Sequence, residues 1–178
     1  MLKLDAAGHL AYKRLPSLQM ISPVSLGRAH WIAITSYTFV AITVFAAPEQ
    51  TANTLTQIRS VLQAQQDAWN RGDIDGFMNG YARSASTVFI SEDTIRRGWQ
   101  TVRDRYRKKY SSRAKMGTLT FSDLEITLLS SDSAMASGRW KLKRATDQPH
   151  GRFTLILKRL PAGWRIVHDH TSAAAPPK

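Results

Sequence analysis

The chain changes its main hydrophobic period at Gly117, and this change limits the folds open to it. Before Gly117, most apolar residues recur every three or four positions, as on one face of a helix, apart from two short strand-like segments. After Gly117, they alternate with polar residues, as on a strand. Helices followed by a run of antiparallel strands is an α+β order. We therefore expect an α+β domain in which about three N-terminal helices lie on one face of a curved antiparallel sheet.

Start and stop signals place the three helices. Thr54 and Gln57 form a capping box that opens the first helix, and Gly72 ends it. Asp73 caps a short second helix, and Gly98 opens a third. The third helix carries an apolar stripe made of Trp99, Val102, Tyr106 and Tyr110.

Alternating segments predict the strands. The expected strands are 86–91, 94–97, 118–130 and two more around residues 134–142 and 153–157, followed by a closing strand at 163–172. In the 118–130 segment the apolar residues switch parity near Ser122 and Asp123. Because successive side chains point to opposite faces, this switch predicts a β-bulge there.

In the closing strand, Gly163-Trp164-Arg165-Ile166-Val167-His168-Asp169-His170-Thr171-Ser172, β-branched and aromatic residues alternate with polar ones. Because successive side chains point to opposite faces, Trp164, Ile166, His168 and His170 are expected on the better-buried face, with Asp169 on the opposite one. We therefore expect two histidines to face the interior.

Two motifs carry a family resemblance. The closing strand has the form G-W-x-I-V-H-x-H-x-S, and residues 68–77 have the form A-W-N-x-G-D-x-D-G-F. Both resemble the nuclear transport factor 2-like superfamily, which includes SnoaL-like and ketosteroid isomerase-like domains, and the closing strand is similar to that of the calcium/calmodulin-dependent kinase II association domain. The resemblance implies a cone-shaped domain over residues 54–172, with a pocket between the first helices and the concave sheet face. The superfamily contains isomerases, dehydratases, cyclases, ligand-binding proteins and oligomerisation modules, so the resemblance does not fix the chemistry.

Candidate pocket residues follow from this placement. His168 is the candidate general base or acid because an unperturbed imidazole titrates near pH ~6.5; a hydrogen-bonded core or interface histidine is the alternative. An arginine inside the cone would bind a carboxylate through two hydrogen bonds, and the sequence does not say which face Arg139 occupies. The full set of expected ligand-binding residues is Trp69, Tyr81, Phe89, Tyr106, Tyr110, Arg139, Trp140, His168 and His170.

The sequence gives no sign of a metal or cofactor site. A metal site at the two histidines lacks a third ligand, since Asp169 is expected on the opposite face and His150 lies in a loop. The chain contains no nucleotide-binding glycine loop, hydrolase elbow or paired-histidine zinc helix. We expect neither a cofactor nor a metal.

The first 46 residues have the pattern of a secretory signal peptide. The run from Trp31 to Ala46 is mostly apolar and uncharged, basic residues precede it, and small residues favour cleavage after Ala46. Met20 would give a more ordinary start. We expect a periplasmic or secreted protein with a lead-in at 47–53 and a disordered tail at 173–178.

The net positive charge of the chain limits the kinds of binding partner that we expect. The full chain has 25 Lys and Arg against 13 Asp and Glu, for a net charge of +12; the leader holds four of these bases and one acid, so the remainder stays at +9. The third helix opposes its apolar stripe with Arg103, Arg105, Arg107, Lys108 and Lys109. Export argues against nucleic acid, so we expect this basic face to be solvated or to contact an anionic membrane or cell-wall surface.

The sequence therefore predicts an exported protein that binds a small apolar or anionic ligand and forms a homo-oligomer, most simply a dimer. Two alternatives stay open: a non-catalytic oligomerisation module, and a small lyase or isomerase using His168. The identity of the ligand and the presence of catalysis are not determined at this stage.

Overall fold

The computed structural model describes residues 47–175, and the predicted leader at 1–46 lies outside them. The chain begins with helices α1 (Ala47–Asn70) and α2 (Ile74–Met78), and α3 (Trp99–Lys109) and α4 (Arg113–Met116) follow the first two short strands. None of the described helices is long and apolar enough to cross a membrane.

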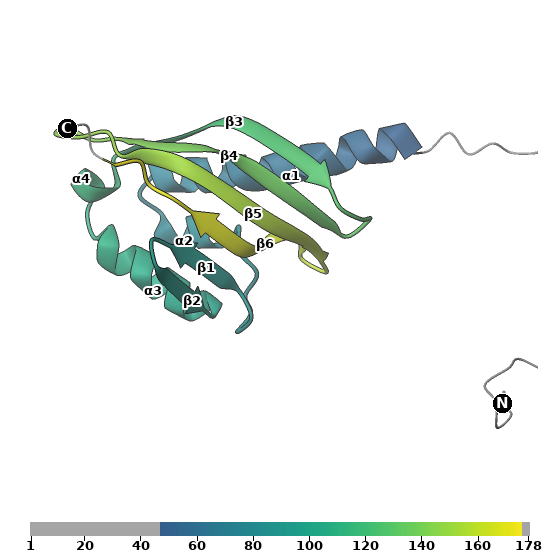
Figure 1. Cartoon of the computed structure of the whole chain (residues 1–178), viewed down its shortest axis with the longest axis horizontal. Helices are drawn as coiled ribbons and strands as arrows, with labels where there is room; N and C mark the ends of the chain where they lie inside the picture. The colour runs from purple at the N-terminus through teal and green to yellow at the C-terminus, as the bar shows by residue number, and fades with distance from the viewer. Residues whose placement is uncertain (1–46, 176–178) are drawn as a thin grey trace, which may run out of the picture. The chain divides into compact units, whose positions relative to one another are not determined.

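Six strands form one sheet. The short strands are β1 (Val88–Ser91) and β2 (Thr94–Arg97), and the long ones are β3 (Thr118–Leu128), β4 (Ser133–Lys143), β5 (His150–Leu160) and β6 (Gly163–Thr171). Their order is β2-β1-β6-β5-β4-β3, and every neighbouring pair is antiparallel except β1 and β6. The sheet is curved and does not close, and the helices lie against one of its faces (Figure 1). The predicted α+β architecture is confirmed.

The first helix starts earlier than predicted. α1 begins at Ala47, so the expected lead-in at 47–53 is helical and the capping box at Thr54 is not the helix start. Pro48 and Glu49 are the signals that mark the true start, because proline tolerates the first turn and an acidic residue there favours the helix dipole. Residues 48–53 of the added turns are exposed, whereas Thr54 is buried.

The connections between the helices agree with prediction. Gly72 ends α1 with φ of +84°, a conformation that favours glycine, and the Asp73 carboxylate caps α2 by accepting from the Gly76 N–H at 2.7 Å. Gly98 precedes α3, and Gly117, with φ of +64°, joins the helical part to β3. The change of period in the sequence therefore coincides with a change of layer in the structure.

The core lies between α1 and the inner face of the long strands. Ile58 and Leu62 of α1 are almost fully buried, as are Leu157 of β5 and Ile166 of β6. Ala134 and Ala136 of β4 are also buried. Towards the other end of the sheet, larger side chains leave a cavity.

Candidate ligand-binding cavity

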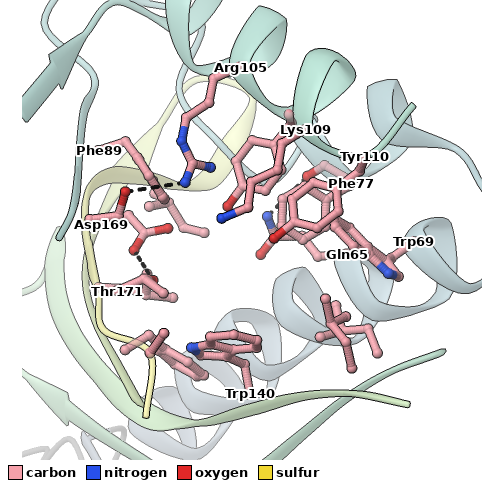
Figure 2. A pocket seen from close by; sticks show the side chains of 18 of the residues that line it. Gln65, Trp69, Phe77, Phe89, Arg105, Lys109, Tyr110, Trp140, Asp169 and Thr171 are labelled. Carbon is pink, nitrogen blue, oxygen red and sulfur yellow. Dashed lines mark hydrogen bonds between the residues drawn. The ribbon is translucent and has the colours of Figure 1, made fainter. Parts of the chain in front are cut away.

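A cavity of about 110 Å³ lies between the helices and the inner face of the sheet. It is mostly apolar, and Figure 2 shows Trp69, Phe77, Phe89, Tyr110 and Trp140 among the side chains that surround it. The exposed residues Glu92, Ser172 and Ala173 form part of its rim, so the cavity opens towards solvent at that end.

Aromatic rings pack edge to face on the helical side. The Trp69 ring centroid lies 5.2 Å from that of Phe77 and 4.6 Å from that of Tyr110, and Tyr106 lies 5.7 Å from Phe89. Such offset arrangements hold the rings in fixed positions. The Trp69 Nε1–H donates to the Met116 carbonyl at 3.3 Å, so the cavity surface contributed by this indole is apolar.

One carboxyl group is buried in the wall. Asp169 of β6 is only 3 % exposed, yet both of its oxygens are satisfied: the Tyr81 hydroxyl donates to Oδ2 and the Thr171 hydroxyl donates to Oδ1, each at 2.6 Å. Burial raises the pKa of Asp169 to about 6, although the two hydroxyl donors oppose this shift. The group can therefore hold or release a proton close to neutral pH.

Two tyrosines extend this polar chain. The hydroxyl oxygens of Tyr81 and Tyr106 lie 3.5 Å apart, and because Tyr81 donates to Asp169, Tyr106 is placed to donate to Tyr81. Burial raises the pKa of both phenols, and the nearby Asp169 charge raises it further. Both phenols stay protonated at neutral pH. The three groups form a hydrogen-bonded line from the carboxylate along the cavity wall.

The α3 helix supplies two cations to the cavity. Arg105 and Lys109 line it from one side, and Figure 2 shows both reaching from α3 towards the space between the aromatic rings. The Arg105 Nη2–H donates to the Ser91 hydroxyl at 3.2 Å. Burial lowers the pKa of Lys109, and the neighbouring Arg105 lowers it further.

Most of the predicted ligand-binding residues line the cavity, and three do not. The six that line it are Trp69, Tyr81, Phe89, Tyr106, Tyr110 and Trp140. Arg139 is exposed on the outer face of the sheet and pairs with Asp123 at 3.5 Å. His168 is half-buried and His170 is exposed, and neither lines the cavity.

The prediction that both histidines share a face with Trp164 and Ile166 is wrong, because β6 contains a bulge. Leu157 of β5 pairs with Ile166, but the next residue, Ile156, pairs with His168, so Val167 is an extra residue. After this bulge Asp169, not His168, points inward. The catalytic role expected of His168 therefore stays a prediction that its position does not favour.

Among the polar lining residues that were not on the predicted list are Asp169, Arg105 and Lys109. For Asp169 the alternation gave the wrong face, and nothing in a single strand indicates a bulge at Val167. Arg105 and Lys109 did carry a signal: they follow Val102 by three and seven residues, which places them beside the stripe of Tyr106 and Tyr110 on the same side of the helix. We had assigned them to the basic outer face.

The basic outer face of α3 is consequently smaller than predicted. Arg103 pairs with Asp75 at 2.7 Å, and Arg107 pairs with the same carboxylate. Hydrogen bonds from both guanidinium groups hold the pKa of Asp75 below its usual value. Within residues 47–175 no group of three or more His, Cys, Asp or Glu side chains is placed to hold a metal ion.

The comparisons with known proteins agree with this architecture. The model of the SnoaL-like domain matches residues 58–176. A search of curated proteins finds no match. Structurally, the chain is similar to an NTF-2 like protein of unknown function from Shewanella oneidensis MR-1, with 39 % identity, 66 % of this chain and 98 % of that chain covered, and a TM-score of 0.64.

More distant structures share the fold. An NTF2-like superfamily protein from Salmonella enterica serovar Typhimurium LT2 is 21 % identical with a TM-score of 0.56, covering 72 % of this chain and 94 % of that one. A ketosteroid isomerase-like protein from Erwinia carotovora atroseptica is 18 % identical with a TM-score of 0.56, covering 68 % of this chain and 97 % of that one. The family model covers most of the domain and the Shewanella protein is matched over nearly its whole length, so this chain belongs to the SnoaL-like family and has the nuclear transport factor 2-like fold.

Proposed function

We propose that this protein binds a small, mostly apolar molecule in the cavity between its helices and its sheet. The observation that carries the proposal is an aromatic cavity of about 110 Å³ with a buried carboxyl group, Asp169, in its wall. This cavity is smaller than an engineered apolar cavity of about 150 Å³ that binds benzene, so its enclosed part suits at most one ring, with further ligand atoms at the open rim.

Native mass spectrometry of the protein purified from its own host tests this proposal. A bound ligand appears as an added mass that is lost on gentle activation. Leu155→Phe fills the cavity from β5, where Leu155 is 4 % exposed, and should abolish the added mass. His170→Leu on the outer face is the matched control and should retain it. Circular dichroism checks that both variants are folded.

Two results would contradict ligand binding. One is equal occupancy in the wild type and Leu155→Phe. The other is a protein that retains no small molecule and whose cavity resonances do not shift with any of a set of aromatic probes.

A second candidate function is proton transfer on a carbonyl compound, with Asp169 as the base. It is favoured by the raised pKa of Asp169, about 6, and by Tyr106, whose O–H could turn from the Tyr81 hydroxyl, 3.5 Å away, to a developing oxyanion. This assignment replaces His168, the base expected from the sequence, with its neighbour.

Solvent exchange tests the base directly. Cyclohexanone is small enough for the cavity, and a base in the wall would accelerate exchange of its α-hydrogens for deuterium, observed by NMR in D₂O. Asp169→Asn should lose the acceleration and His168→Ala should keep it. Equal rates in the wild type and Asp169→Asn would exclude Asp169 as the base.

Export and self-association complete the proposal. Export is supported by the apolar run from Trp31 to Ala46, and N-terminal sequencing of the protein from its host should give a start near Ala47.

A dimer is supported by the outer face of the sheet, where Met135 pairs with Ile156 and Ile156 with His168. All three are half-buried and have no covering helix among the described residues. Ile156→Lys should dissociate the dimer in analytical ultracentrifugation; a wild-type monomer would contradict it.

A further inference from the structure

The two cations of α3 that line the cavity indicate what the ligand carries. We propose that the ligand is a small carboxylate with an apolar ring, whose carboxylate group binds Arg105 and Lys109 while its ring occupies the aromatic cavity (Figure 2). This inference rests on the proposed ligand-binding function and specifies the chemical class of the ligand.

Arg105 is oriented by its surroundings, and the attraction between it and Asp169 does not amount to an ion pair. Its guanidinium lies over the Phe89 ring at 4.5 Å and near the Tyr106 ring at 5.5 Å, and one N–H donates to Ser91. A guanidinium has five N–H donors in a planar fork that matches a carboxylate. Among the ion pairs formed by residues 47–175, none involves Arg105. Donors therefore remain for an anion at the cavity.

Lys109 lies one helical turn further on and belongs to a surplus of positive charge. Burial lowers its pKa first, and Arg105, Arg144 and Arg96 lower it further, with the exposed Glu92 as the opposing charge. Arg144 has a partner in Asp147 at 3.3 Å, but its Nε and the Nη1 of Arg96 are buried without hydrogen bonds to the described residues. An anion beside Lys109 would offset this unfavourable concentration of cations.

Asp169 is not the anion that pairs with Arg105 and Lys109. Its two oxygens accept from the Tyr81 and Thr171 hydroxyls, and no hydrogen bond or ion pair in the described part of the chain joins it to Arg105 or Lys109. Arg105 and Asp169 attract each other electrostatically, as Lys109 and Glu92 do, but no carboxylate of the described residues forms an ion pair with either cation.

The apolar lining favours a carboxylate with a ring over a small inorganic anion. Inorganic phosphate could contact Arg105 and Lys109, but it would leave the space beside Trp69, Phe77 and Trp140 without an apolar occupant. A ring attached to the carboxylate satisfies both parts of the site at once.

Benzoate and benzamide provide a matched pair of probes, since they share shape and differ in charge. Both are titrated into the full chain and followed by ¹H–¹⁵N NMR, with inorganic phosphate as a third probe. We expect benzoate to bind at least about tenfold more tightly than benzamide, because charge-assisted hydrogen bonds are the stronger ones. Phosphate should bind more weakly than benzoate.

Variants locate the effect. Arg105→Gln and Lys109→Met should each reduce benzoate affinity about tenfold or more and reduce benzamide affinity much less, because benzamide loses only a neutral hydrogen bond. Lys108→Met removes the same charge from the neighbouring position on α3, which is exposed as Lys109 is but does not line the cavity, and is the control. It should leave both affinities unchanged.

The outcomes separate this inference from the function on which it rests. Benzoate and benzamide binding equally well in the cavity would overturn the carboxylate assignment and keep ligand binding. A benzoate preference that survives in both Arg105→Gln and Lys109→Met would overturn the assignment to these residues. Phosphate binding as tightly as benzoate would replace the ring carboxylate by a simple anion, and saturable shifts with none of the probes would count against both proposals.

Discussion

Strands β3 and β6 each contain one extra residue, but only the bulge in β3 can be recognised in the sequence. In β3, Ser122 pairs with Arg139 and Glu125 with Ser137, and Asp123 within this interval has φ of +50°. In β6 the extra residue is Val167, which is not among the described non-glycine residues with positive φ.

The two bulges differ in the residues that follow them, because only apolar residues show in the sequence that the buried face has changed. In β3, Leu119 lies before the bulge and Ile126 beyond it on the opposite parity, and the bulge itself holds an aspartate, which tolerates left-handed geometry better than most residues. In β6 the residues beyond the bulge, His168 to Thr171, are all polar, so no apolar side chain marks the change of face. A bulge is visible in sequence only when apolar residues continue on its far side.

The largest effect should distinguish the two residues at the β6 bulge. Ile166 is 1 % exposed and points into the core, whereas Val167 is half-buried. Ile166→Ala should cost about 2–4 kcal/mol in the free energy of unfolding, measured in urea, because it leaves a cavity. Val167→Ala should cost less than about 1 kcal/mol. Equal costs would place the bulge elsewhere.

The next effect concerns Asp169 and pH. Its pKa in the folded protein, about 6, exceeds the ordinary value of 3.8, so the folded state holds the proton more tightly than the unfolded chain does. The stability that this group contributes is present below pH ~4 and is lost as pH rises through ~6, by at most about 3 kcal/mol. Asn cannot titrate at this position. The free energy of unfolding of Asp169→Asn should therefore rise relative to that of the wild type, by up to that amount, between pH 4 and pH 7.

Urea unfolding at both pH values measures this gain. Asp123→Asn, at the exposed bulge of β3, is the control and should show a stability difference from the wild type that changes little with pH. A constant difference between Asp169→Asn and the wild type would mean that Asp169 is not the buried, titrating group.

A smaller effect is expected at the bulge of β3. Asp123→Val places a β-branched residue at φ of +50° and should cost about 1–2 kcal/mol, whereas Asp123→Asn keeps a residue that tolerates this geometry and should stay within about 0.5 kcal/mol. The pair with Arg139 is exposed and contributes little to either value. Comparable losses in both variants would argue that the ion pair, not backbone geometry, matters here.

The smallest effect should come from the histidine first expected to be catalytic. His168→Ala should change benzamide affinity by less than about twofold, since the side chain lies outside the cavity. Tyr106→Phe, which removes a hydroxyl from the wall, is the comparison and should change it more. A larger loss in His168→Ala than in Tyr106→Phe would restore the inward face that alternation predicted.

The sequence by itself determined the layers of this protein. The change of period at Gly117, the stop at Gly72 with its Asp73 cap, and the parity switch near Asp123 are local signals, and each is confirmed. The aromatic members of the site, such as Trp69 and Trp140, were also predictable, because large apolar side chains fall on the inner faces of their elements.

Only the tertiary structure decided which polar groups face the cavity. The pairing of β6 with β5 contains an extra residue at Val167, and this turns Asp169 inward. There the Tyr81 hydroxyl, 88 residues away in the chain, donates a hydrogen bond that offsets part of the free-energy cost of burying the carboxyl group. Arg105 becomes a cavity residue because α3 packs with that side against Phe89 of β1. Such choices depend on partners distant in sequence, which local periodicity does not record.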